Sequence, residues 1–177
     1  GKERGQLIMP CGSGKTLVGL WLKEALEASC TLVLVPSLYL LRQIKETWAL
    51  ERKHFYEYLC VCSENDIQEG KDNFCTQIYE MGTKVTARIE AIEDFLKVTG
   101  EKVIFSTYQS LHNIAEAIKL LDSSFSFDFV FCDEAHRTAG IAHKGFFTQI
   151  HHQEKIPAKK RLYATATPRI LSEKSSK

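Results

Sequence analysis

The sequence MPCGSGKT at residues 9–16 lies between an apolar QLI (6–8) and a helix-like LVGLWLKEALEA (17–28). A strand that ends in a glycine-containing turn and opens a helix is the setting that a phosphate-binding loop requires, because backbone N–H groups must converge on an anion at a helix N-terminus. The stretch departs from the pattern G-x-x-x-x-G-K-[ST] at its first position, where Met9 replaces glycine. By itself it favours a nucleotide site over a chance strand–turn–helix connection.

Each residue of the loop has an expected role. Gly12 and Gly14 allow unusual dihedrals and a close approach of the backbone to phosphate, and Ser13 contributes a loop amide between them. Lys15 supplies a positive charge for the β- and γ-phosphates, and Thr16 supplies a hydroxyl for Mg²⁺.

Apolar runs of strand length alternate with segments of helical period along the rest of the chain. The runs are almost continuously apolar, which is typical of a parallel sheet that is covered on both faces. The expected strands are 6–9, 31–35, 58–62, 102–107, 127–133 and 161–166, and the expected helices are 15–28, 38–49, 88–98, 111–121 and a less periodic 144–153. The alternation predicts an α/β fold with right-handed crossovers, and residues 63–82, which lack a period, are expected to form a surface excursion.

The composition narrows the class of protein. The 177 residues suit one ordinary domain, and apolar and charged fractions of 44% and 25% are those of a folded globular chain. A formal net charge of +1 gives no general attraction to nucleic acid or a membrane, so any nucleic-acid contact must be local. No apolar run approaches the ~18 residues of a membrane span and no signal peptide opens the chain, which predicts a cytoplasmic protein without a membrane partner.

The six cysteines include no C-x-x-C pair and no Cys/His spacing of a zinc site. Several lie in apolar strand-like runs, where a free thiol packs as a small hydrophobic group. We therefore expect reduced cysteines, and we interpret the histidine pair at 151–152 as an exposed helix end rather than half of a metal site.

A second motif, FDFVFCDEAHRT at residues 127–138, places two acids directly after an apolar run. Asp133 and Glu134 then lie at the carboxyl end of a buried strand, the edge at which ligands bind in open α/β sheets. There Asp133 is suited to hold Mg²⁺, and Glu134 to orient and deprotonate an attacking water. A solvated Asp-Glu turn explains the acids alone, but their combination with the loop at 9–16 predicts a nucleoside triphosphatase.

Five stretches together resemble a known superfamily. MPCGSGKT (9–16), DEAH (133–136) and YATATP (163–168) resemble motifs I, II and III of superfamily-two helicases and translocases. LVLVPSLYLLRQ (32–43) and STYQSL (106–111) are similar to its motifs Ia and Ib. Within the superfamily, these motifs and their flanking residues are most similar to the motor lobes of Type I, Type III and Type ISP restriction enzymes.

The resemblance implies a three-layer RecA-like P-loop domain with a mostly parallel central sheet and helices on both faces. It implies that residues 1–171 are the N-terminal ATP-binding lobe and that residues 172–177 are a frayed tail or the start of a linker. The second RecA-like lobe, which in this superfamily carries arginine fingers, is not part of these residues. Because such arginines are worth ~10³–10⁵ in rate in related systems, we expect the isolated lobe to be nearly inactive.

Further site residues follow from the resemblance alone. His136, Thr165 and Thr167 would couple hydrolysis to movement. Ser37 and Thr107 would contact the nucleic-acid backbone, although Ser37 is equally suited to cap a helix.

The implied function is the ATP-binding lobe of an ATP-dependent translocase of a restriction or phage-defence enzyme, driven along duplex DNA by ATP and Mg²⁺. ATP, rather than another nucleotide, is implied only by the resemblance. Nuclease and methyltransferase domains or subunits would lie outside this chain. Two alternatives stay open: a DEAH-type helicase that separates RNA or DNA strands, and a nucleotide-gated binding module that does not hydrolyse.

Overall fold

The structure is a computed structural model and describes residues 3–62, 85–134, 150 and 154–166. The expected excursion over 63–82 lies outside the described residues. So does the expected helix over 144–153, apart from Ile150.

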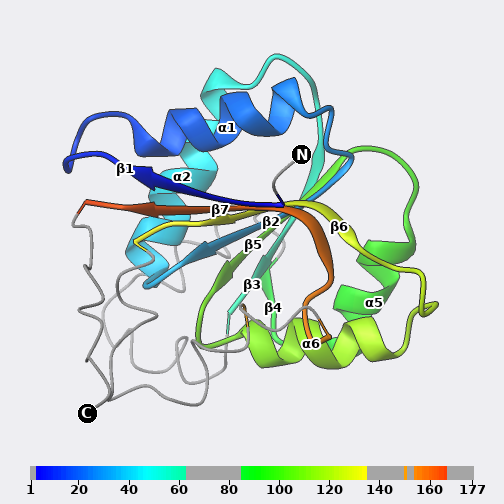
Figure 1. Cartoon of the computed structure of the whole chain (residues 1–177). Coiled ribbons are helices and arrows are strands. Elements are labelled where there is room, and N and C mark those ends of the chain that lie inside the picture. The colour runs from blue at the N-terminus through cyan, green and yellow to red at the C-terminus, as the bar shows by residue number, and fades with distance from the viewer. Residues whose placement is uncertain (1–2, 63–84, 135–149, 151–153, 167–177) are drawn as a thin grey trace, which may run out of the picture.

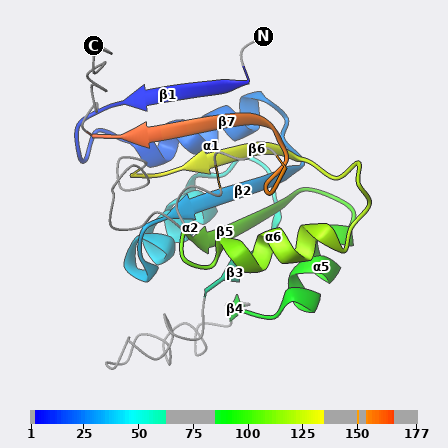
Figure 2. The ribbon, with the colours of Figure 1, turned by 60° about the horizontal axis from the view of Figure 1, so that its bottom comes forward.

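In the described part of the chain, seven strands form one sheet in which every neighbouring pair is parallel. Strands of this kind are buried on both faces, which explains their almost continuous apolar runs. Figure 2 shows the strands side by side. From one edge of the sheet to the other they are β1 (Arg4–Ile8), β7 (Ala158–Thr165), β6 (Phe127–Cys132), β2 (Cys30–Val35), β5 (Lys102–Thr107), β3 (Glu57–Val61) and β4 (Val85–Thr86).

Two hydrophobic cores lie on opposite faces of this sheet, because successive side chains of a strand point to opposite sides. Val33 packs in the core beneath one pair of helices, whereas its neighbours Leu32 and Leu34 pack in the other core. Figure 1 shows the sheet between the two pairs. The first pair is α1 (Lys15–Ala25) and α2 (Leu38–Glu51), and the second is α5 (Ile89–Lys97) and α6 (Leu111–Lys119).

The predicted fold class is therefore confirmed, and the differences are local. The short strand β4 was not predicted, since two residues are too few to show a period. Strand β7 begins at Ala158, three residues before the predicted start. The basic run at 159–161 is consequently part of a strand: Arg161 is 3% exposed and donates to the carbonyls of Ile150 and Ile156.

Gly19 brings the backbone of α1 against the ring of Phe131. A Cβ atom at this position would lie 2.9–3.0 Å from three ring atoms, which is too close for carbon atoms to pack. Overpacking of a core costs ~1–3 kcal/mol, whereas alanine gains ~1 kcal/mol over glycine in helix propensity. We therefore expect Gly19→Ala to lower the free energy of unfolding by about 1 kcal/mol. Urea denaturation measures the difference.

The control for this prediction is a double-mutant cycle with Phe131→Leu, which removes the ring that the new methyl group meets. The cost of Gly19→Ala should be smaller in that background. Strictly additive costs would contradict the proposed clash.

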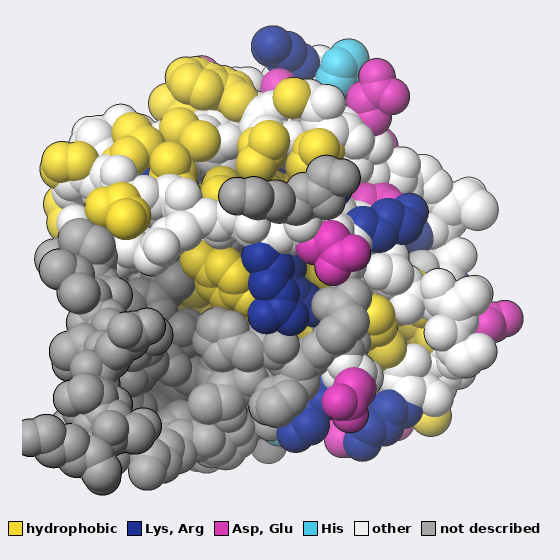
Figure 3. Space-filling model, viewed as in Figure 1, with side chains coloured by type: hydrophobic (Ala, Val, Ile, Leu, Met, Phe, Trp, Pro, Cys, Tyr) yellow, Lys and Arg dark blue, Asp and Glu magenta, His cyan; other side chains and the backbone are white. Residues whose placement is uncertain are grey.

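Strand β1 is an edge strand, since within the described residues it pairs only with β7. Ile8 at its end and Trp21 on α1 are 50% and 54% exposed. Figure 3 shows hydrophobic side chains gathered over the upper left of the molecule, where Figure 1 places α1 and the end of β1.

No helix in the described ranges is long and apolar enough to cross a membrane.

Candidate nucleotide-binding site

Parallel strands bring the predicted site residues together at the edge of the sheet that is formed by the carboxyl ends of the strands. Ile8 at the end of β1 pairs with Thr165 at the end of β7. Val35 at the end of β2 pairs with Thr107 at the end of β5, and β6, which lies between β7 and β2, ends at Cys132. The loop after β1, the two acids after β6 and the turn after β5 therefore share this edge.

The loop before α1 has the backbone of an anion-binding turn. Gly12 and Gly14 have φ angles of 76° and 93°, a region that glycine enters without strain. A Cβ atom at either position would meet nothing within 4 Å, so the backbone conformation is what requires glycine. Gly14 caps α1 without a side-chain hydrogen bond, and no acidic residue lies in the first turn. The N–H groups of Leu17 and Val18 donate to Gly14 O at 3.0 and 3.1 Å, and this end of the helix carries the positive end of its dipole.

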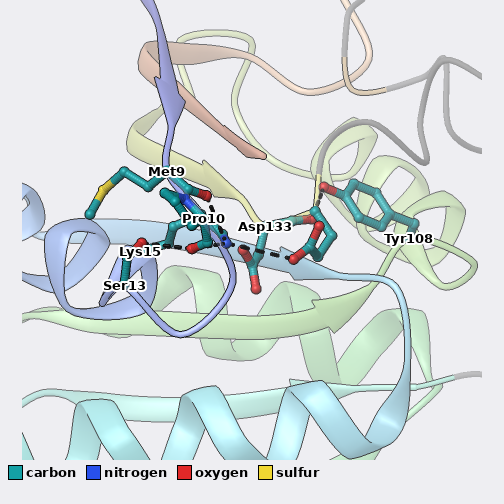
Figure 4. A network of polar contacts seen from close by, with 7 residues as sticks. Met9, Pro10, Ser13, Lys15, Tyr108 and Asp133 are labelled. Atoms are coloured by element: carbon teal, nitrogen blue, oxygen red, sulfur yellow. Dashed lines mark hydrogen bonds and ion pairs between the residues drawn. The ribbon is translucent and has the colours of Figure 1, made fainter. Parts of the chain in front are cut away.

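Lys15 is the first residue of α1, directly after the loop, and is 7% exposed. Its Nζ donates to the carbonyls of Met9 at 3.3 Å and Pro10 at 3.2 Å, and lies 3.9 Å from Glu134 Oε1 (Figure 4). Met9 acts here through its backbone, since its N–H donates to Thr165 O at 3.1 Å. Among described non-glycine residues only two have a positive φ, and Met9 is not one of them, so this position does not require glycine.

The two acids directly follow β6. The N–H of Asp133 donates to Leu34 O at 2.8 Å, and its carbonyl accepts from the Tyr108 hydroxyl at 2.9 Å. Glu134 has a φ of 49°, a left-handed conformation that costs a residue with a Cβ atom about 1–2 kcal/mol. Burial raises the pKa of Tyr108 well above its ordinary value, so this hydroxyl keeps its proton at neutral pH.

The other predicted site residues differ in where they lie. Thr165 is buried beside the phosphate loop, whereas His136 and Thr167 lie outside the described residues. Ser37 caps α2, accepting from the N–H of Leu40 at 3.4 Å.

Thr107 does not lie at the surface. It is 1% exposed, and its Oγ1 lies 3.0 Å from Ser110 Oγ within the turn after β5. The exposed residue of this turn is Gln109. In this structure a ligand at the turn therefore meets Gln109 before it meets Thr107.

Two aromatic residues support the site in ways that the sequence analysis missed. The indole Nε1 of Trp48 in α2 donates to Thr16 O at 2.9 Å and so ties α2 to the first turn of α1. The hydroxyl of Tyr108 likewise donates to Asp133 O at 2.9 Å and ties the turn after β5 to the two acids. Trp48 lies on the apolar face of α2, where its ring indicates core packing, and Tyr108 lies in the polar turn STYQSL (106–111). The available signal was that buried indole and phenol groups usually find hydrogen-bond partners.

This arrangement suits a polyanion together with a hard cation. Phosphate groups bind at a helix N-terminus next to a lysine, and carboxylate and hydroxyl oxygens are the ligands that Mg²⁺ prefers. Lys15, the first turn of α1 and the acids at 133–134 provide these groups at one edge of the sheet.

The comparisons with known proteins agree with the fold. Residues 1–170 match the family described as "Type III restriction enzyme, res subunit". The chain resembles two Type ISP restriction-modification enzymes: a nuclease-deletion mutant of LlaGI in complex with a DNA substrate mimic (TM-score 0.76, 35% identity) and the ATP-dependent LlaBIII bound to DNA (TM-score 0.77, 33% identity). The matches cover 97% and 94% of this chain, but only 14% and 11% of those chains.

A viral protein matches over the same length. A probable helicase of African swine fever virus (isolate Tick/Malawi/Lil 20-1/1983) is 29% identical over 174 residues, which is 98% of this chain and 18% of the viral protein. The chain thus spans less than a fifth of each of these relatives. The family match, the helicase relative and the two restriction enzymes confirm the resemblance to superfamily two that the motifs indicated. The chain belongs to the family of the Type III restriction enzyme res subunit, as a helicase-type RecA-like domain.

Proposed function

We propose that this chain is the ATP-binding lobe of an ATP-dependent DNA translocase of a restriction or phage-defence enzyme, which hydrolyses ATP to move on duplex DNA. The observation that carries the proposal is the approach of Lys15 Nζ to within 3.9 Å of Glu134 Oε1, beside a helix N-terminus that has no side-chain cap. The ammonium group of Lys15 is suited to bind phosphate, and the carboxylate of Glu134 is suited to activate water. The two groups lie together in a chain of the Type III restriction enzyme res subunit family.

Lys15 changes partners when nucleotide binds. Its present acceptors, the carbonyls of Met9 and Pro10, are neutral, and phosphate oxygens at the same place are stronger acceptors because they are charged. The amides of Gly12, Ser13 and Gly14 would complete the phosphate cradle. Because these contacts depend on backbone geometry and one point charge, they recognise the triphosphate and leave the base to other parts of the protein.

The acids would act on the other side of the phosphates. Asp133 and the hydroxyl of Thr16 would hold Mg²⁺, which when bound neutralises charge on the phosphate oxygens. Glu134 would accept a proton from the attacking water. Its carboxylate lies 3.9 Å from Lys15 Nζ, which keeps it beside the loop that would hold the phosphates.

Movement would be coupled to hydrolysis through strand β7. Thr165 accepts from the N–H of Met9, so a change in the phosphate loop reaches the end of β7 through the backbone. Thr167 and His136 are proposed to act with Thr165, as the resemblance implies. A second RecA-like lobe would close over this edge and supply the remaining charge.

Duplex DNA is the proposed track because the two restriction enzymes that the chain resembles were solved with DNA or a DNA mimic. Ser37, which caps α2, would meet a backbone phosphate at this end of the helix, as the resemblance implies. A contact by the Thr107 hydroxyl would require its pair with Ser110 to open, and Gln109 is the exposed group of that turn.

The function is tested with the full-length protein. ATP hydrolysis is measured with duplex DNA, single-stranded DNA and RNA, and movement is followed by displacement of the third strand from a DNA triplex. We expect stimulation by duplex DNA and triplex displacement that requires ATP. Unwinding of a partial duplex without triplex displacement would support a strand-separating helicase, the class named for the viral relative. Nucleotide binding without turnover would support a switch.

Cys11 reports directly on the phosphate loop. It is the exposed cysteine among those described, whereas burial raises the pKa of Cys60 and of Cys132 to about 12 and leaves these thiols unreactive. We expect Mg-ATP to protect Cys11 from iodoacetamide, measured by mass spectrometry of the tryptic peptide 5–15. A Lys15→Met variant, whose tryptic peptide extends over residues 5–23, should lose this protection. Equal labelling of Cys11 with and without nucleotide would contradict binding at this loop.

A further inference from the structure

Tyr108 connects the turn after β5 to the ends of two other strands, β2 and β6. Its backbone N–H donates to Val35 O at 3.0 Å, at the end of β2. Its hydroxyl donates to Asp133 O at 2.9 Å, just past the end of β6 (Figure 4). The side chain is fully buried, so its ring has one defined position from which the hydroxyl reaches this carbonyl.

The turn that carries Tyr108 is itself held in place. The N–H of Ser110 donates to Thr107 O at 3.2 Å, and the N–H of Leu111 donates to Tyr108 O at 3.3 Å. The hydroxyl groups of Thr107 and Ser110 also lie 3.0 Å apart. A turn with these contacts presents the tyrosine ring as a rigid support rather than a mobile side chain.

The carbonyl that Tyr108 holds belongs to the peptide group between Asp133 and Glu134. The φ angle of Glu134 is the rotation about the bond that follows this peptide, and it has the left-handed value of 49°. The Asp133 N–H is already fixed by Leu34 O at 2.8 Å, so the Tyr108 hydroxyl fixes the peptide on the other side of Asp133. Both carboxylates are thereby directed from a backbone that has little freedom to rotate.

We propose that Tyr108 is a positioning residue for ATP hydrolysis: its hydroxyl holds the Asp133–Glu134 peptide so that the Glu134 carboxylate stays beside Lys15 and the phosphate loop. This inference rests on the proposed function of the site. It gives Tyr108 a role distinct from core packing, because a residue that only packed would not need its hydroxyl.

The test is Tyr108→Phe in the full-length protein, which keeps the ring and removes the hydrogen bond. We expect kcat for ATP hydrolysis to fall about tenfold, the effect of one hydrogen bond of ordinary net strength when its loss is felt in the transition state. The Kd of a fluorescent ATP analogue should stay within about twofold, because the phosphate loop is untouched. Tyr56→Phe is the matched control, since Tyr56 is also buried and precedes β3 at the opposite edge of the sheet.

Three outcomes overturn the inference alone: an unchanged kcat in Tyr108→Phe, an equal fall in Tyr56→Phe, or effects of Tyr108→Phe and Glu134→Gln that multiply fully in the double variant. A positioning residue should instead add little once Glu134 has lost its function. If Tyr108→Phe fails to fold, 3-fluorotyrosine at this position keeps the shape and alters donor strength, and an unchanged kcat then counts against the role. A wild-type protein that binds ATP without hydrolysing it overturns the proposed function as well.

Discussion

Glu134→Gln should lower kcat for ATP hydrolysis by about 10²–10⁴-fold in the full-length protein, the usual contribution of a general base. Glutamine keeps the volume of the side chain but cannot accept a proton from water. The Kd for nucleotide should change little, because Lys15 keeps its contacts to the loop carbonyls of Met9 and Pro10 and the phosphate loop itself is unaltered. Steady-state hydrolysis and equilibrium binding of a fluorescent ATP analogue separate the two effects.

The matched control is Glu101→Gln. Glu101 also pairs with a buried lysine of α1, Lys23 at 2.7 Å, but it lies before β5 at the opposite edge of the sheet. This variant loses the same charge and should retain the wild-type kcat. Unchanged turnover in Glu134→Gln would assign the base to another residue, and absence of turnover in the wild type would favour a nucleotide switch.

Lys15→Met should lower kcat by about 10²–10³-fold, the range for removing one electrostatic donor from a preorganised site. It should also weaken nucleotide binding, which distinguishes it from Glu134→Gln. In this structure the Nζ group donates to two loop carbonyls, so methionine also leaves Met9 and Pro10 without that donor. We therefore expect a small fall in melting temperature even without nucleotide.

Lys159→Met is the control for this second prediction. Lys159 forms an exposed ion pair with Asp128 at 2.7 Å, and exposed pairs contribute little to stability. Its loss should leave both hydrolysis and nucleotide affinity unchanged. Lys15→Arg should fail to restore activity, since a planar guanidinium cannot replace a compact ammonium group between the loop carbonyls. Wild-type nucleotide affinity in Lys15→Met would contradict the site.

The fold could be predicted to within a few residues at most element ends because its signals are local. Apolar runs mark strands buried on both faces, and helices of 9–14 residues each carry an apolar face. The misplaced start of β7 has a physical reason. Its charged residues have partners outside the strand that the sequence pattern does not show: Lys159 pairs with Asp128, and Arg161 donates to the carbonyls of Ile150 and Ile156.

The candidate site was also visible in the sequence, since strand-end motifs of a parallel sheet must meet at one edge. The loop residues, Asp133 and Glu134 needed no more than this rule. Thr107 shows what this rule does not predict. The rule places Thr107 at the carboxyl ends of the strands, but it does not predict that the side chain is directed inward to Ser110. Hydroxyl orientation depends on the nearest acceptor, which strand periodicity does not encode.

The sequence by itself determined the order of strands and helices, the phosphate loop and the presence of two acids after a buried strand. The tertiary structure decided how these parts are held. Trp48 reaches Thr16 across 32 residues, and Tyr108 reaches Asp133 across 25. Each contact joins an aromatic side chain to a backbone carbonyl, and a carbonyl is present at every position, so no residue type marks the partner in advance. The packing of each ring determines which carbonyl it reaches. For Tyr108 this is the carbonyl of Asp133, in the peptide group that precedes Glu134.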